Sequence, residues 1–326
     1  MKKMNPRHRP LLGAVCALAL AALATADACA QADYPSKPVK IIVPYPPGGA
    51  VDVVTRKMAQ KLTQQMGQSF IIDNKPGGTG TIGATAVARA EADGYTLMAN
   101  DTTFSLLPFI FRKLPFDHDK DLTPVSAYVF APMSLVVNAE SPYKTLPDFI
   151  SAAKASPGKL TYGTGGAGTT PHFTAEAFGL ASGVKLMHIP FKGAGEATQA
   201  VLSKTIDMQF SSTPGVMGNV KGGKLRILGV SGDKRLVALP DVPTFAQAGL
   251  RSFGVVNWTG LWAPKGTPPA VVSRLQAEIA KAMATPDMKA FAEGLGSEPR
   301  VADAPAFARM VADSNALWGR FAANTA

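Results

Sequence analysis

Residues 39–52 read VKIIVPYPPGGAVD, and this stretch contains the first of two units that decide the fold. The apolar run at 39–43 is typical of a short buried strand. A loop of proline and glycine follows, and apolar residues then recur at helical spacing over residues 51–62. Gly67 ends this pattern, as glycine commonly does at the C-terminus of a helix. The stretch therefore predicts a strand, a glycine loop and a helix in direct succession.

Residues 160–172 read LTYGTGGAGTTPH and contain the second unit. Here the predicted strand covers 160–162 and the glycine loop covers 163–170. Pro171 fits the first position of the following helix, where no backbone N–H is missed, and Thr170 is therefore the predicted N-cap.

The rest of the chain alternates in the same way. Further strands are predicted at 69–73, 95–99, 133–137, 186–191, 206–210 and 225–230, and further helices at 82–90, 146–155, 196–202, 271–284 and 305–321. Such alternation is typical of the α/β class, with parallel strands joined by right-handed crossovers. The length of 326 residues favours two lobes over one.

The first 30 residues predict a secretory signal peptide. Four basic residues precede an apolar run at 11–24, and Ala28-Cys29-Ala30 offers a small-residue cleavage site. The apolar run is shorter than the ~20 residues needed to span a bilayer. An uncleaved anchor and a lipoprotein attached at Cys29 stay open as alternatives. A periplasmic protein that starts at Gln31 is the expected product.

Composition excludes several classes of function. Both cysteines, Cys16 and Cys29, lie in the predicted signal peptide, so the mature chain has no thiol for a disulfide, a nucleophile or a metal site. The chain has 33 Lys and Arg against 23 Asp and Glu, and 29 against 22 remain after residue 30. This modest positive charge suits anions. It is not clustered into runs, which argues against nucleic-acid binding.

The two glycine loops together suit an anion. A helix N-terminus presents free backbone N–H groups and about half a positive charge. Gly48 and Gly49 allow a ligand close to the main chain, and Thr169 and Thr170 bring hydroxyl donors to the second loop. Asp52 in the first turn of the helix either contacts the ligand region or simply caps the helix.

Binding energies favour a clamp over a surface site. Each charge-assisted hydrogen bond contributes ~1.5–3 kcal/mol, whereas micromolar affinity needs ~8 kcal/mol. One loop hardly supplies that much, but two loops that close over a carboxylate do. Tyr45 either covers the carbon skeleton of the ligand or packs as a partly exposed side chain.

Other motifs fit less well. GTGGAG at 163–168 matches the dinucleotide fingerprint, but the next strand ends at Phe191-Lys192 without the acidic residue that holds the ribose. No catalytic motif is present in the sequence. Residues 117–121, DHDKD, are either a metal-binding cluster or, as we prefer, a solvated loop. His172 either faces the cleft, is exposed to solvent or makes a structural hydrogen bond.

The motifs along the chain resemble those of the Bug family, the substrate-binding components of tripartite tricarboxylate transporters. The motifs are YPSKP (34–38), IIVPYPPGGAVD (41–52), NKPG (74–77), DGYTL (93–97), YGTGGAGT (162–169), HIPFKG (188–193), LPDVPT (239–244) and WTGLWAPKGTP (258–268). The resemblance implies a type II periplasmic binding protein fold of class α/β, with a ligand cleft between two Rossmann-like lobes. It also implies that the chain crosses between lobes and returns, so that residues 31–129 and 252–326 form lobe 1 and residues 130–251 form lobe 2.

The resemblance further implies carboxylate binding by the two loops. The predicted ligand-binding residues are Tyr45, Pro47, Gly48, Gly49, Asp52, Thr164, Gly165, Gly166, Gly168, Thr169, Thr170, His172 and Ser211. Ser211 stands where the family usually has Asp, and other departures occur at Glu196, Ala200 and Ser203-Lys204. These departures put the identity of the ligand in doubt, above all for ligands with an amino group.

The sequence thus predicts a periplasmic solute-binding protein and not an enzyme. We expect it to capture a small mono- or dicarboxylate for uptake by membrane permease subunits of a tripartite tricarboxylate-type transporter. A ligand-dependent partner of a membrane sensor is the alternative. No cofactor, metal or nucleic acid is expected, and a monomer is expected.

Overall fold

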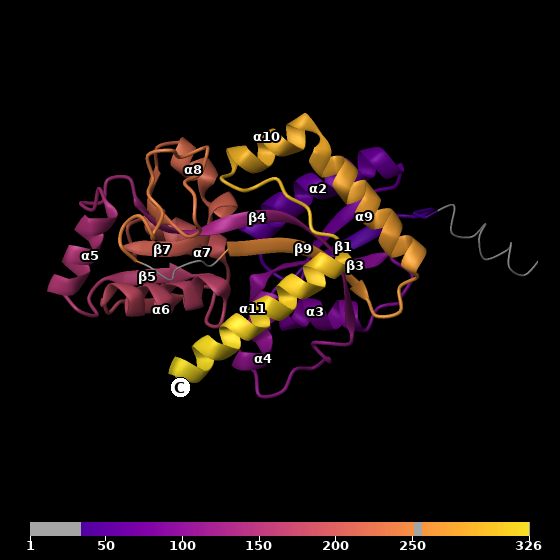
Figure 1. Ribbon diagram of the computed structural model, residues 1–326, viewed down its shortest axis with the longest axis horizontal. Coiled ribbons are helices and arrows are strands. Elements are labelled where there is room, and N and C mark those ends of the chain that lie inside the picture. The colour runs from indigo at the N-terminus through magenta and orange to yellow at the C-terminus, as the bar shows by residue number, and fades with distance from the viewer. Residues whose placement is uncertain (1–33, 251–255, 326) are drawn as a thin grey trace, which may run out of the picture.

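The computed structural model describes residues 34–250 and 256–325, and the predicted signal peptide with its cleavage site lies outside these residues. Figure 1 shows an elongated molecule in which helices surround a central sheet. The strands are β1 (Val39–Val43), β2 (Phe70–Asn74), β3 (Thr96–Asp101), β4 (Leu122–Asn138), β5 (Thr161–Thr164), β6 (Met187–Pro190), β7 (Met208–Ser212), β8 (Leu225–Val230) and β9 (Val256–Pro264). The α-helices are α2 (Ala50–Met66), α3 (Thr81–Ala88), α4 (Leu107–Ile110), α5 (Leu146–Ala155), α6 (Thr170–Ser182), α7 (Ala194–Leu202), α8 (Met217–Lys221), α9 (Pro269–Ala284), α10 (Pro286–Gly294) and α11 (Ala304–Thr325).

The sheet has two halves that share strand β4. In the first half, β1 pairs in parallel with β2 and β3, and β9 lies antiparallel between β3 and β4. In the second half, β5 pairs in parallel with β6 and β7, while β7 and β8 pair antiparallel with β4. The parallel pairs confirm the α/β pattern, and the antiparallel pairing of β4 with β7, β8 and β9 was not predicted.

Strand β4 joins the two halves. Its residues 122–132 pair with β9, and its residues 133–138 pair with β7 and β8. Figure 1 shows β4 and β9 running side by side through the middle of the molecule. A chain that crosses between lobes and returns needs two such strands. The residue boundaries of the two lobes stay a prediction.

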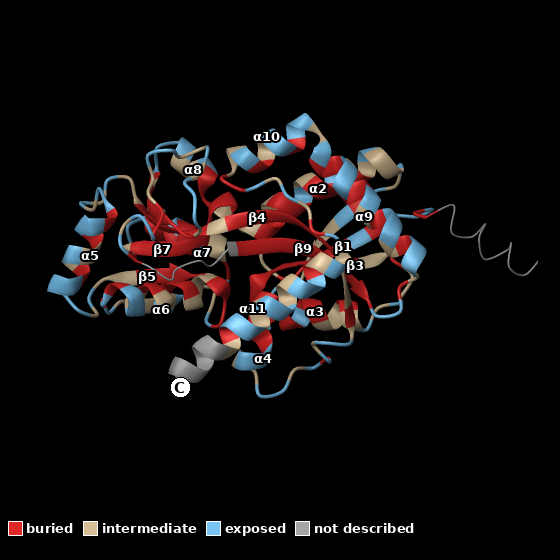
Figure 2. Cartoon of the chain, in the orientation of Figure 1, coloured by how far each residue is buried: buried red, intermediate tan, exposed pale blue. Residues whose placement is uncertain are grey.

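The sheet is the most buried layer of the molecule, as the red strands of Figure 2 show. In the first half, the apolar face of α2 packs with α9 on the strands, through residues such as Val54, Leu62 and Leu275. In the second half, Phe149 of α5 and Phe178 of α6 cover β5 and β7. Each loop at a strand end is therefore anchored on both sides by a packed strand and a packed helix.

Helix bounds were predicted better than the strands at the centre. Helix α5 has its predicted bounds, because Thr145 and Asp148 form a capping box at its start. By contrast, the predicted strand at 133–137 is only the end of β4, and β9 was missed. Pro124 and Pro132 lie inside β4, and proline normally argues against a central strand.

Candidate ligand-binding site

The first glycine loop follows β1 and leads into α2. Gly48 has φ +87°, a left-handed conformation that glycine adopts without strain. Its amide donates to Asp52 Oδ2 over 2.9 Å, and Asn74 Nδ2 donates to Asp52 Oδ1 over 2.9 Å. Asn74 Nδ2 also donates to the carbonyl of Tyr45 over 3.0 Å. The loop is thus folded around the Asp52 carboxylate.

Asp52 is the electrostatic anchor of this loop. Its residue is only 3% exposed, and it pairs with Arg56, whose Nε donates to Oδ2 over 2.9 Å. Burial raises the pKa of this carboxyl, but the hydrogen bonds from Arg56, Gly48 and Asn74 outweigh burial and hold the pKa below its usual value. Asp52 therefore stays ionised and organises the loop. Its predicted contact with ligand stays a prediction.

The first turn of α2 presents uncapped amides. The first hydrogen bond of the helix runs from Val53 N to Gly49 O over 3.0 Å, and the N-cap residue Gly49 has no side chain to cap it. The amides of residues 50–52 therefore have no intrahelical acceptor. No side chain of the described residues accepts from them either. This end of α2 carries the positive end of the helix dipole.

A buried polar cluster, missed in the sequence, supports the same loop. The Tyr45 hydroxyl lies 2.7 Å from Asn100 Oδ1 and 2.9 Å from Asp101 Oδ1. Asp101 Oδ1 also accepts from Thr103 N over 3.0 Å, and Asn257 Nδ2 lies 3.3 Å from Asp101 Oδ2. Burial raises the pKa of Asp101. The sequence contained one signal for this cluster. Asn100 and Asp101 lie at the carboxyl end of β3, and the carboxyl ends of neighbouring parallel strands meet at one edge of a sheet.

Several polar groups of the second glycine loop bond to side chains of the loop itself and of α6. The Thr164 hydroxyl accepts from Gly166 N over 3.2 Å, and the Thr169 hydroxyl donates to Gly166 O over 2.8 Å. Gly168 N donates to His172 Nδ1 over 3.3 Å. Gly166 and Gly168 have φ values of +131° and +79°, which explains why glycines are needed at both positions.

The predicted N-cap of α6 was wrong by one residue. Thr169 is the N-cap, Thr170 is the first helical residue, and Pro171 therefore takes the second position. Thr170 is drawn into the helix by Thr103: Thr170 N donates to Thr103 Oγ1 over 3.1 Å, and the two hydroxyls lie 3.0 Å apart. Thr103 thus plays the capping role that the sequence assigned to Thr170.

Segments of the second half-sheet lie directly against the first loop. A Cβ on Gly193 would lie 2.8 Å from the Pro46 ring, and a Cβ on Gly195 would lie 3.6 Å from the carbonyl of Pro47. The Thr79 hydroxyl donates to Ala167 O over 3.2 Å, which links the second loop to the first half. The two loops are therefore brought to one region.

Two more predicted residues lie in or beside this region. A Cβ on Gly215 would lie 3.3 Å from Ala50 N and 3.4 Å from Ser211 Oγ. Ser211 is buried, and its hydroxyl donates to Ser212 O over 3.2 Å. Gly165 lies against the 193–194 backbone, where a Cβ would come within 2.9 Å of Ala194 N. The predicted residues thus gather around the first turn of α2 and the second loop.

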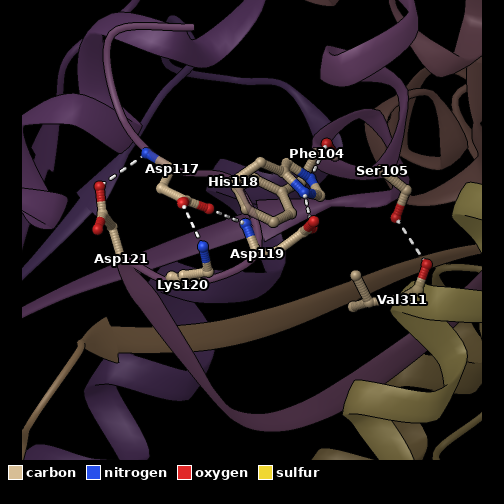
Figure 3. A network of polar contacts seen from close by, with 8 residues as sticks. All are labelled: Phe104, Ser105, Asp117, His118, Asp119, Lys120, Asp121 and Val311. Atoms are coloured by element: carbon tan, nitrogen blue, oxygen red, sulfur yellow. Dashed lines mark hydrogen bonds and ion pairs between the residues drawn. The ribbon is translucent and has the colours of Figure 1, made fainter.

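The acidic stretch at 117–121 bonds within itself, as Figure 3 shows. Asp117 N donates to Asp121 Oδ2 over 2.7 Å, Asp119 N donates to Asp117 Oδ1 over 3.1 Å, and Lys120 Nζ lies 3.3 Å from Asp117 Oδ2. His118 Nε2 bonds the carbonyl of Phe104 over 3.0 Å. These contacts are those of a self-bonded connecting loop. Within residues 34–250 and 256–325, no three His, Asp or Glu side chains are placed so that they could hold one metal ion.

Comparison with known proteins identifies the family. The family model described as the tripartite tricarboxylate transporter family receptor matches residues 54–325. The chain belongs to this receptor family. The resemblance to the Bug family is thereby confirmed, and the chain is a periplasmic solute-binding receptor of this type.

Individual relatives of the receptor agree with this assignment. A UPF0065 protein from the gbd 5′ region of Cupriavidus necator is 37% identical over 305 residues, which cover 93% of this chain and 92% of the relative. The structure of the periplasmic binding protein BugD has a TM-score of 0.84 at 30% identity and covers 88% of this chain and 97% of its own. The structure of R. palustris Rpa4515 with adipate has a TM-score of 0.86 at 30% identity and covers 90% and 98%. These structures establish the periplasmic binding protein fold for the receptor.

Proposed function

We propose that the protein is exported to the periplasm, binds a small mono- or dicarboxylate at the first turn of α2, and delivers it to membrane permease subunits without chemical change. The observation that carries this proposal is the uncapped start of α2, where the amides of residues 50–52 meet no acceptor among the residues that the structure describes. A carboxylate there accepts several N–H groups and meets the positive end of the helix dipole. Family membership supports transport over catalysis.

The contacts of the first loop with the second half-sheet support binding by closure. Pro46 and Pro47 meet Gly193 and Gly195 without an intervening side chain. A ligand at the start of α2 would therefore touch both halves, and binding would favour the closed arrangement by the difference in contacts between the two states. The same surface then distinguishes the loaded receptor from the empty one for the permease.

The uncharged side chain of Ser211 favours a ligand that has no ammonium group. Its hydroxyl is uncharged, and its oxygen lies beside the Gly215 position that faces Ala50 N. An amino acid bound here would need a carboxylate partner for its ammonium group, because an unpaired buried charge is costly. We therefore propose a simple or hydroxylated carboxylate. The bound adipate of Rpa4515 is a precedent within the family.

Thermal unfolding of the mature chain, residues 31–326, tests the proposal. The protein is first unfolded and refolded to remove copurified ligand, and then heated with adipate, malate, benzoate or glutamate and with the amide of adipate. A ligand at ~100 times its Kd stabilises the folded state by ~2.7 kcal/mol. We expect a shift with at least one simple acid and none with the amide. Equal shifts with the acid and its amide would contradict carboxylate recognition, and a shift with glutamate alone would contradict the role given to Ser211.

No helix among the described residues is both long and apolar enough to cross a membrane. Mass spectrometry of the periplasmic protein tests whether the N-terminal segment attaches the protein to the membrane. We expect an unmodified N-terminus at Gln31. A lipid found on Cys29 would mean that the receptor is anchored to the membrane and not free in the periplasm.

A further inference from the structure

Three aromatic rings from three elements stack behind the second glycine loop. Tyr162 of β5 stacks on His188 of β6, with ring centroids 4.8 Å apart and planes 21° apart. His188 in turn stacks on His172 of α6, with centroids 4.3 Å apart and planes 27° apart. The column thus ties together the strand before the loop, the helix after it and the neighbouring edge strand.

Both histidines also bond directly to the loop. His188 Nε2 lies 2.7 Å from Thr164 Oγ1, the hydroxyl that also accepts from Gly166 N. His172 Nδ1 accepts from Gly168 N over 3.3 Å. An Nδ1 that accepts must be unprotonated, so His172 carries its proton on Nε2, which lies 4.0 Å from Glu176 Oε1. The hydrogen bond from Gly168 N therefore exists only while His172 Nδ1 is unprotonated.

We propose that His172 and His188 are positioning residues that hold the second loop in its binding conformation only while both rings are neutral, so that the receptor loses its carboxylate ligand in acid. The part of this proposal that concerns the ligand rests on the proposed function. The part that concerns the loop does not. His188 was not among the ligand-binding residues predicted from the sequence.

Protonation breaks the arrangement in two ways. A proton on His172 Nδ1 would face the Gly168 N–H, so two donors would meet and the hydrogen bond would be lost. Two imidazolium rings at the observed stacking distance would also repel each other. The loop would then move out of the conformation that the hydrogen bonds hold at Gly166 and Gly168.

The surroundings of the pair favour the neutral rings. The titratable groups placed against it are Tyr162, which donates to Glu176 over 2.5 Å, and Glu176 itself, which is half exposed. Burial and the charge of His172 lower the pKa of His188 to about 4, against a smaller raising effect of Glu176. Burial also lowers the pKa of His172, again against Glu176.

The sign of the pH effect follows from these shifts. Both histidines have a pKa in the folded protein below the ordinary value of 6.5. Their contribution to stability is therefore complete above that value and is lost as the pH falls towards about 4. Protons can reach the stack from solvent, because the side chain of His172 is 24% exposed.

Amide exchange and binding, measured on the full mature chain from about pH 7 to about pH 4, test the proposal. Exchange of the Gly166 and Gly168 amides is followed by NMR relative to the intrinsic rate at each pH, and the Kd for adipate is measured by calorimetry. The key variant is His172→Asn with His188→Gln, which places uncharged amide groups where the ring nitrogens lie. His172→Asn alone is the second variant, and His118→Gln is the matched control away from the loop.

We expect protection of the Gly168 amide to fall in acid in the wild type and in the control, but not in the double variant. With half of His188 protonated near pH 4, the ratio of the wild-type Kd to the double-variant Kd should rise at least about twofold from its value at neutral pH. This ratio cancels the protonation of adipate itself. A constant ratio and constant protection in a folded protein would overturn the proposal.

The two readouts separate the failure of this inference from the failure of the proposed function. If adipate binds at no pH, the exchange data alone decide. Loss of Gly168 protection in the wild type and in His118→Gln, but not in the double variant, would then support the positioning role. Unchanged protection would overturn it, whatever the ligand.

Discussion

The two glycine loops look alike in sequence and differ in what they leave free. The loop before α2 uses Gly48 N to bind Asp52, but within residues 34–250 and 256–325 the amides at the start of the helix have no acceptor. In the loop before α6, side chains accept from several amides, since Thr170 N donates to Thr103 and Gly168 N donates to His172. A side chain from elsewhere that caps a helix therefore removes an amide that an anion could otherwise bind.

This difference assigns different tasks to the two loops. The first loop offers charge complementarity to an anion, through uncapped amides and the helix dipole. The second loop offers a fixed shape, through its own hydroxyl bonds and the stacked histidines. We infer that the first loop contributes most of the recognition of a carboxylate and that the second forms a pre-organised wall.

The largest expected effect is at the anchor of the first loop. Asp52→Asn removes the charge that Arg56 and the Gly48 amide bind. Loss of a well-bonded buried charge destabilises proteins by ~3–5 kcal/mol, but Arg56 is half exposed, so we expect about 2 kcal/mol here. Urea denaturation monitored by circular dichroism measures this change.

Asp148→Asn is the matched control for this prediction. Asp148 also accepts backbone amides at the start of a helix, but it is exposed on the surface. Its replacement should cost about 1 kcal/mol, the ordinary effect of a helix cap. Equal losses in both variants would show that Asp52 is only a cap, which was the alternative interpretation of its sequence position.

The contrast between the loops also marks what sequence could predict. Asp52, Gly48 and Gly49 act locally, within one turn of each other, so helical spacing and glycine chemistry were enough to find them. Asp101 and Thr103 act on both loops from another strand end, far away in the sequence. Periodicity contains no information on such contacts, and the N-cap of α6 was misplaced for this reason.

The same limit explains the errors in the fold. The outer strands of each half follow the strand–helix alternation and were predicted to within about two residues. Strands β4 and β9 join the halves, and their antiparallel pairing depends on two segments that are distant in the chain. The family motifs implied that the chain crosses and returns, but they did not show which strands carry the crossing.

The next largest effect concerns the contact between the first loop and the second half-sheet. Gly193→Ala places a Cβ 2.8 Å from the Pro46 ring, closer than carbon atoms pack, while its extended backbone accepts alanine. If closure on a ligand needs this approach, affinity should fall about tenfold, which corresponds to about 1.4 kcal/mol. Calorimetry with the acid that gives the largest thermal shift measures the change.

Gly218→Ala is the control for this steric test, because a Cβ at Gly218 meets nothing within 4 Å. We expect its affinity to equal that of the wild type. Wild-type affinity in Gly193→Ala would mean that the loops need not meet around the ligand. The first loop would then recognise the ligand and the second loop would support it without the two loops closing together as a clamp.

The smallest expected effect concerns the hydrogen bond from Thr170 N to Thr103 Oγ1, which leaves the second loop without a free amide at Thr170. Thr103→Val keeps the size of the side chain but removes the acceptor of Thr170 N, so a buried amide loses its partner. The loss should be about 1 kcal/mol of stability, at the low end for an unsatisfied buried donor, because Thr170 can recover a contact by small rotations. Thr103→Ser is the matched variant, since it keeps the hydroxyl and should restore most of the stability.

Ligand binding by the same two variants tests the division of tasks between the loops. Thr103→Val makes α6 resemble α2 by freeing its first amide, so affinity for a dicarboxylate should rise or stay constant even as stability falls. A fall in affinity that Thr103→Ser does not reverse would mean that the second loop recognises the ligand through its present geometry, and that the division of tasks between the loops is wrong.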